Sequence, residues 1–113
     1  MFSPPDSVSV YVCLAPTDMR RSFDRLAGMV HEIILQNPLS GHLFMFVSKR
    51  KNMLKILFWD RTGYCQYYKR LENGTFCIPF CDDEEQRSMS ISAEQLRLIL
   101  DGIDVLGAKR KMA

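Results

Sequence analysis

The sequence lacks the long apolar runs that mark a membrane protein. No stretch approaches the 18 consecutive apolar residues of a transmembrane helix, and residues 1–6 have neither the basic nor the apolar region of a signal peptide. We therefore expect a cytoplasmic protein with no membrane partner. The 113 residues, 47% of them hydrophobic and 25% charged, predict one soluble globular domain with a modest core.

Recognised catalytic motifs are also missing. The chain has no glycine-rich phosphate loop, no HExxH pair and no Ser/His/Asp arrangement at a recognisable spacing. Asp18, Asp60 and Asp104 could gather as the metal ligands of a nuclease or transferase, but aspartate is also common at turns and helix caps. We expect a protein that is not an enzyme, with no catalytic residues, no metal and no cofactor.

The chain has four cysteines: Cys13, Cys65, Cys77 and Cys81. The first three lie in apolar, strand-like runs, where a free thiol behaves as a small hydrophobic group. Cys77 and Cys81 have a spacing found in zinc sites, and His31 or His42 could add a ligand, but no second ligand pair follows. We expect free thiols, because disulfides are rare in the cytoplasm.

The first half of the chain predicts a strand and then a long helix. Residues 8–14 are rich in β-branched side chains, and Ala15-Pro16 would end that strand. Thr17 or Asp18 would cap a helix whose apolar residues recur at three and four, until Asn37-Pro38 ends it. Arg20 and Arg21 would then lie in its first turn and form an anion site with the helix N-terminus.

Four strands joined by short loops should follow, over residues 43–48, 53–59, 64–71 and 75–79. Short loops imply an antiparallel meander, and Asn73-Gly74 is a favoured hairpin turn. Residues 80–87 would form an acidic loop, and residues 88–91 could add a short edge strand. Ser92 and Gln95 form a capping box for a second helix, which Gly102 would end.

The predicted fold class is α+β. We expect a single domain in which an antiparallel β-meander sheet of four to five strands packs with one long N-terminal helix and one shorter C-terminal helix. Residues 1–7 would form a loose arm, residues 8–105 the globular domain and residues 106–113 a basic tail.

Positive charge is concentrated in the middle of the chain. Residues 49–70 hold seven cations against one acid, Asp60, which gives a local net charge of +6 in a chain whose net charge is +2. Acids concentrate instead at residues 82–85. This segregation predicts a face of positive potential, and the aromatic residues among the cations suit phosphate contact with base stacking.

The expected binding residues for nucleic acid or a protein partner are cations and aromatics: Arg20, Arg21, Arg25, Lys49, Arg50, Lys51, Lys55, Trp59, Tyr68, Lys69 and Arg70. Strand alternation places Lys55 and Trp59 on one face, opposite an apolar core face of Leu54, Ile56 and Phe58. Lys49 to Lys51, at a hairpin tip, are best placed to reach a phosphate backbone. The alternative is an ordinary solvated surface, on which the aromatics pack and Arg20 pairs with Asp24.

Several separate motifs carry a family resemblance. They are TDMRRSFDRL at 17–26, SGHLFMF at 40–46, KILFWD at 55–60, YKRLE at 68–72, SAEQL at 92–96 and DGID at 101–104. Together they closely resemble the accessory protein of insertion sequence 66 elements, the product of the second open reading frame. Only the cysteine-rich segment 76–81 and the acidic segment 82–85 depart from that pattern.

The resemblance implies a bacterial protein encoded beside a DDE-type transposase and needed for efficient transposition. The catalytic carboxylates would belong to the transposase, so the resemblance transfers no catalytic residues to this chain. We expect a non-enzymatic accessory protein that binds element DNA, the transposase of the same element, or both. The alternatives are a pure protein-interaction module without DNA contact and, in a third class, a metal-dependent nuclease. An exposed sheet edge would also allow a homo-oligomer.

Overall fold

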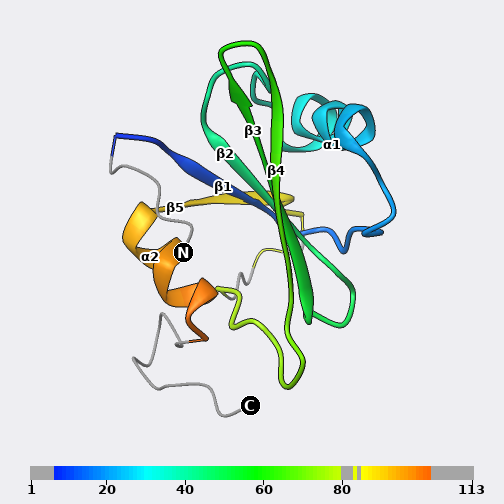
Figure 1. The fold of residues 1–113 in the computed structure, drawn as a ribbon, viewed down its shortest axis with the longest axis vertical. Coiled ribbons are helices and arrows are strands. Elements are labelled where there is room, and N and C mark those ends of the chain that lie inside the picture. The colour runs from blue at the N-terminus through cyan, green and yellow to red at the C-terminus, as the bar shows by residue number, and fades with distance from the viewer. Residues whose placement is uncertain (1–6, 80–82, 84, 103–113) are drawn as a thin grey trace.

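A five-stranded sheet with helices on both of its faces forms the fold (Figure 1). The computed structural model describes residues 7–79, 83 and 85–102. In chain order the elements are β1 (Val10–Cys13), α1 (Phe23–Met29), the π-helix η1 (Val30–Ile34), β2 (Leu43–Val47), β3 (Met53–Asp60), β4 (Gly63–Arg70), β5 (Ser88–Ile91) and α2 (Ala93–Leu100). Within these residues no helix is long and apolar enough to cross a membrane. The predicted α+β class is confirmed.

The sheet is mixed, with strand order β4-β3-β2-β1-β5. β1 and β2 pair in parallel, with Val10 opposite Leu43 and Cys13 opposite Phe46, whereas the other three pairs are antiparallel. The predicted purely antiparallel meander is therefore wrong. Parallel neighbours need a long crossover connection, and α1 with η1 supplies it. β2 is buried at all five positions, as expected for a strand covered on both faces.

The predicted long N-terminal helix is wrong at its start and in its form. Residues 17–22 are not helical, and Met19 and Arg20 form a turn. In this turn the Arg20 N–H donates to Asp18 Oδ1 at 2.9 Å and the Arg21 N–H donates to the Asp18 carbonyl at 3.1 Å. Asp18 therefore caps a turn, and Ser22 occupies the N-cap of a seven-residue helix. Aspartate favours such turns as strongly as helix caps. The helix then widens into η1 and ends at Leu35, which is left-handed with φ of 62°.

The predicted strand over residues 75–79 is also wrong. The Phe76 N–H donates to the Lys51 carbonyl at 2.7 Å, and the Phe76 side chain is buried in the core beneath α2. Gly74 turns the chain with φ of 77°, but the segment that follows forms no ladder with β4. The segment after Gly74 therefore contacts the β2–β3 turn through Phe76 and does not pair with β4. The Asn73-Gly74 turn does not form a hairpin.

Each face of the sheet has its own apolar core. Phe44, Phe46 and Leu57 pack against α1 and η1. Leu54 and Ile56 point to the other face, where they pack with α2. The predicted core face of β3 is confirmed, but the opposite face of β3 is equally covered, so neither face is an open wet surface.

The start and end of α2 match the sequence pattern. Ser92 Oγ accepts from the Gln95 N–H at 3.0 Å, and Gln95 Oε1 accepts from the Ser92 N–H at 2.9 Å. Gly102 follows the helix with φ of 78°. The capping box and the glycine stop are both confirmed, as is the short edge strand β5. Residues 1–6 of the predicted arm and all of the predicted basic tail lie outside the described residues.

Replacing Ser92 with alanine should lower the free energy of unfolding by about 1 kcal/mol, because the Gln95 N–H loses its acceptor. Chemical denaturation measures the change. Ser90→Ala is the matched control, since Ser90 is exposed on β5 and should change stability by less than about 0.5 kcal/mol. Equal effects of the two substitutions would contradict the capping role.

Candidate nucleic-acid interface

The turn between β2 and β3 displays three adjacent cations on a fixed backbone. The Ser48 N–H donates to the Met53 carbonyl at 3.0 Å, and the Lys51 N–H donates to the Ser48 carbonyl at 2.9 Å. Lys51 is left-handed with φ of 61°, and its carbonyl accepts from Phe76. The side chains of Lys49, Arg50 and Lys51 are all exposed, and within the described residues none of them forms an ion pair.

Two residues that close this turn were not singled out in the sequence. Ser48 Oγ accepts from the Met53 N–H at 3.2 Å and lies 3.3 Å from Asn52 Oδ1. Serine and asparagine flanking a cationic tripeptide are a turn pattern, and that pattern was the available signal. These side-chain contacts add to the backbone hydrogen bonds that define the conformation of the turn.

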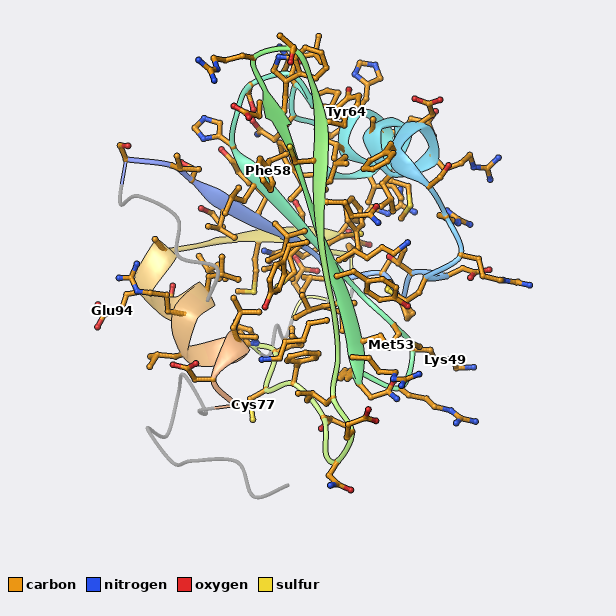
Figure 2. All side chains as sticks on the ribbon, in the orientation of Figure 1. Lys49, Met53, Phe58, Tyr64, Cys77 and Glu94 are labelled. Carbon is orange, nitrogen blue, oxygen red and sulfur yellow. The ribbon has the colours of Figure 1, made fainter. Side chains whose placement is uncertain are left out.

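Other cations lie beside the turn at the same end of the sheet. Figure 2 shows Lys49 and Met53 at this end and Tyr64 at the opposite end. Arg70 is in register with Met53 on the neighbouring strand. A shallow hollow of about 340 Å³ joins Asp18 and Met19 to Lys49, Arg50 and Met53. We call this surface the basic end, and it consists of Arg20, Lys49, Arg50, Lys51, Tyr68 and Arg70.

Tyr68 provides an aromatic ring at the basic end. It is 51% exposed, and its hydroxyl donates to Met53 Sδ at 3.3 Å. The Lys55 ammonium lies 4.8 Å from the centroid of the same ring. The ring is therefore held in place from two sides while half of its surface stays open to a partner.

Two exposed ion pairs border the basic end. Arg20 binds both Asp18 oxygens, with Nη2 2.7 Å from Oδ2 and Nε 3.1 Å from each oxygen. Hydrogen bonds from the Arg20 side chain and backbone lower the pKa of Asp18 from 3.8 to about 2. The Asp18 carboxylate is therefore charged at neutral pH. The predicted alternative pairing with Asp24 is not formed.

The second pair joins Arg70 Nη2 to Glu72 Oε1 at 3.5 Å. Both pairs lie in solvent, where such contacts contribute little to stability. Each arginine can therefore exchange its carboxylate for a phosphate with little loss of folding free energy.

Lys55 has an internal role. It is only 6% exposed, and its Nζ donates to the Arg21 carbonyl at 3.0 Å. Arg21 itself is half-buried, with Nη1 3.1 Å from Met29 Sδ. Lys55 therefore ties the 17–22 segment to β3. The sequence predicted Lys55 and Arg21 as surface binding residues, but the Lys55 side chain is buried and the Arg21 side chain is half-buried.

Three further predicted residues lie away from the basic end. Lys69 points to the other face of the sheet, where its Nζ donates to the Leu100 carbonyl at 2.9 Å. Trp59 packs edge-on against Tyr64 at 5.1 Å, and six residues of strand, about 20 Å, separate it from Met53. Arg25 is exposed on α1. The strand register places Lys55, Trp59, Tyr68 and Arg70 on one face of the sheet, but Trp59 lies at the end of that face away from the basic end.

The candidate metal ligands are dispersed where the chain is described. In that part no three His, Cys, Asp or Glu side chains gather in an arrangement that could hold an ion. His42 Nδ1 accepts from the Ser9 N–H at 3.1 Å, and Asp60 lies 3.8 Å from Arg61. Cys13 is a free, buried thiol, and burial raises its pKa. Cys81 and Asp104 lie outside the described residues.

The family model described as "IS66 Orf2 like protein" matches residues 8–110. The chain belongs to this family. The resemblance drawn from the sequence motifs is thereby confirmed, and the family points to an accessory role in the transposition of insertion sequences. No solved structure matches this IS66 Orf2-like protein.

Two relatives come from Sinorhizobium fredii (strain NBRC 101917 / NGR234). "Uncharacterized protein y4hO" is 38% identical over 104 residues, which are 92% of this chain and 88% of the relative. "Uncharacterized protein y4jC" is 32% identical over 111 residues, which are 98% of this chain and 92% of the relative. Neither name describes an activity.

Replacing Lys55 with methionine should lower the free energy of unfolding by about 1–3 kcal/mol, because the Arg21 carbonyl loses its donor while the side-chain length is kept. Denaturant unfolding measures the change. Lys49→Met is the control, because Lys49 is exposed and should shift stability by less than about 0.5 kcal/mol. A Lys55→Met variant as stable as its parent would show that the buried ammonium does not hold the 17–22 segment.

Proposed function

We propose that this IS66 Orf2-like protein is a non-enzymatic accessory factor that binds element DNA through the basic end during transposition. The observation that carries the proposal is the β2–β3 turn, where Lys49, Arg50 and Lys51 are exposed on a hydrogen-bonded backbone. None of the three has an ion-pair partner among the described residues. Three adjacent cations without carboxylate partners form a surface that attracts a polyanion.

The chemistry of the basic end suits phosphate contact. Lysine presents a compact ammonium and arginine a planar fork, and both groups bind phosphate oxygens. Arg20 and Arg70 add two cations whose exposed carboxylate partners are easily replaced. Such contacts position a protein on DNA without reading its sequence. We therefore expect binding that depends strongly on salt and weakly on base sequence.

Tyr68 adds an open aromatic ring beside these cations. A ring held at the edge of a phosphate-binding surface can stack on an unpaired base. The proposed DNA contact thus consists of the six residues of the basic end. Arg21 and Lys55 hold the segment that carries Arg20 against β3 through their hydrogen bond. Arg25, Trp59 and Lys69 take no part in the proposed contact.

A second candidate function is a protein-interaction module that contacts the transposase without touching DNA. The observation that favours it is the exposure of apolar side chains between η1 and β2, where Leu35 is 75% and Leu39 51% exposed. Exposed apolar groups suit a protein partner. Binding through these leucines would persist at high salt, whereas binding through the basic end would not.

Fluorescence anisotropy with a duplex from the element's end and a random duplex, over a salt series, tests the DNA contact. A variant with Lys49→Gln, Arg50→Gln and Lys51→Gln should reduce the slope of log affinity against log salt by about 2.7, because each lost phosphate contact removes about 0.9. Glutamine keeps the side chain polar and leaves the strain at residue 51 unchanged.

Single substitutions provide a matched control. Arg50→Gln and Arg61→Gln each remove one cation from an exposed turn, but Arg61, with its side chain 91% exposed, lies at the opposite end of β3. Only Arg50→Gln should change the salt slope. Failure of the folded parent to bind either duplex at low salt would overturn DNA binding. Capture of the transposase at high salt, lost on changing Leu35 and Leu39 to serine, would then support the second candidate.

A further inference from the structure

α1 carries a hollow on its outer face. The hollow has a volume of about 340 Å³, and its lining comes entirely from one stretch of the chain: Arg21, Asp24, Arg25, Gly28, Met29 and Glu32. α1 runs directly into η1, so most of this lining lies on one helical run, residues 23–34. In Figure 1 α1 lies on the side of the sheet away from α2, at the margin of the molecule. No other segment of the described chain lines the hollow, so it is open to a partner.

The hollow exists because Gly28 has no side chain. Glycine inside a helix is less stable than alanine, and here the fold gives no reason for it. A Cβ at Gly28 would meet no atom within 4 Å, and its backbone is not among the left-handed glycines of the described chain. What glycine does allow is the close approach of another backbone. The residue at position 28 therefore suits a helix that packs against α1 from outside.

Charges of both signs surround the glycine. Asp24, Arg25 and Glu32 are exposed, and within the described residues none of them forms an ion pair. On the N-terminal side of the glycine, Arg21 and Arg25 against Asp24 give 2 − 1 = +1, and on the C-terminal side Glu32 gives −1 beside a neutral His31. This face differs from the basic end, because its acids would repel DNA. It suits a protein surface with the complementary order of charges.

We propose that this face of α1 binds the same face of a second copy of the chain, with the two helices antiparallel and Gly28 against Gly28. A two-fold axis through this point relates the copies, so each contact occurs twice. The proposal concerns assembly and does not rest on DNA binding. None of the six residues of the basic end lines the hollow, so the two proposals can fail separately.

The order of charges selects a second copy as the partner. In the antiparallel arrangement the positive side of one copy lies against the negative side of the other, on both sides of the axis. Arg25 and Glu32 lie about 4.5 and 6 Å along the helix from Gly28, in opposite directions, so Arg25 of each copy meets Glu32 of the other. Asp24 is the one acid on the positive side, and two arginines outweigh it. A parallel pair would set like charges against each other.

The size of the contact sets the strength of the association. Residues 21–32 span about 18 Å of helix, so one such face buries less than the roughly 800 Å² per partner of a standard interface. Glycine at the crossing point allows the two helices to approach more closely than the usual 8–10 Å between axes. We therefore expect a dimer that dissociates on dilution.

Sedimentation velocity of the full chain over a range of concentrations, with a reductant because Cys65 and Cys77 are free and only partly buried, measures the association. Gly28→Gln should raise the dissociation constant at least tenfold, because its side chain keeps the helices apart. Glutamine is a better helix former than glycine, so at low concentration this variant should unfold at a denaturant midpoint no lower than that of the parent. Ser90→Gln adds similar bulk on exposed β5 and should leave the association unchanged.

A mixture of two charge variants tests the order of charges across the axis. Arg25→Glu makes both sides of the glycine negative, and Glu32→Arg makes both sides positive, so each variant alone should lose association. An equimolar mixture should associate at least tenfold more tightly than either variant alone, because every contact across the axis then joins opposite charges. Arg61→Glu, in the β3–β4 turn outside the hollow, is the control, and mixing it with Glu32→Arg should give no such gain.

Three results would overturn self-association. They are a parent chain that stays monomeric at every concentration, a Gly28→Gln variant that associates as tightly as the parent, and a mixture of charge variants no tighter than its components. A fourth result would assign the face to another partner. If the chain alone is monomeric but binds the transposase through a contact that Gly28→Gln abolishes, the hollow belongs to the transposase and the proposal is contradicted.

Discussion

The parallel pairing of β1 with β2 is the constraint on which the rest of this structure depends. Two parallel neighbours require a crossover, so α1 and η1 must cover one face of the sheet. Their carboxyl ends also meet at the same end of the sheet. The segment that follows β1, which carries Arg20, therefore leaves the sheet beside the turn that follows β2, which carries Lys49 to Lys51. The basic end is thus a direct consequence of the topology.

A buried cation then fixes the position of the exposed ones. Lys55 lies on β3 in register with Phe46 and Tyr68, and its ammonium binds the carbonyl of Arg21. Its neighbour across the ladder, Tyr68, is held by Met53. One lysine therefore organises both the segment that precedes α1 and the aromatic ring of the basic end, although it presents almost no surface to a partner.

Local signals in the sequence were sufficient for the local parts of this fold. The strands other than the one expected over residues 75–79, the Ser92–Gln95 capping box, the stop at Gly102 and the cationic turn at Lys49 all depend on neighbours within a few residues. The parallel pairing was not predictable, because an apolar run such as Leu43–Val47 suits a central strand of either direction. Asp18 suits a turn as well as a helix cap. The burial of Lys55 and of Phe76 depends on contacts made by residues far apart in the chain.

The most direct test of this account is a map of the amides that respond when the folded protein meets DNA. Backbone ¹H–¹⁵N spectra, recorded while a duplex from the element's end is added, give that map residue by residue. The account predicts shifts at Arg20, Lys49 to Lys51, Tyr68 and Arg70, with Arg61 and Trp59 unmoved. Shifts centred on Arg61, Leu35 and Leu39, with the β2–β3 turn unmoved, would contradict it.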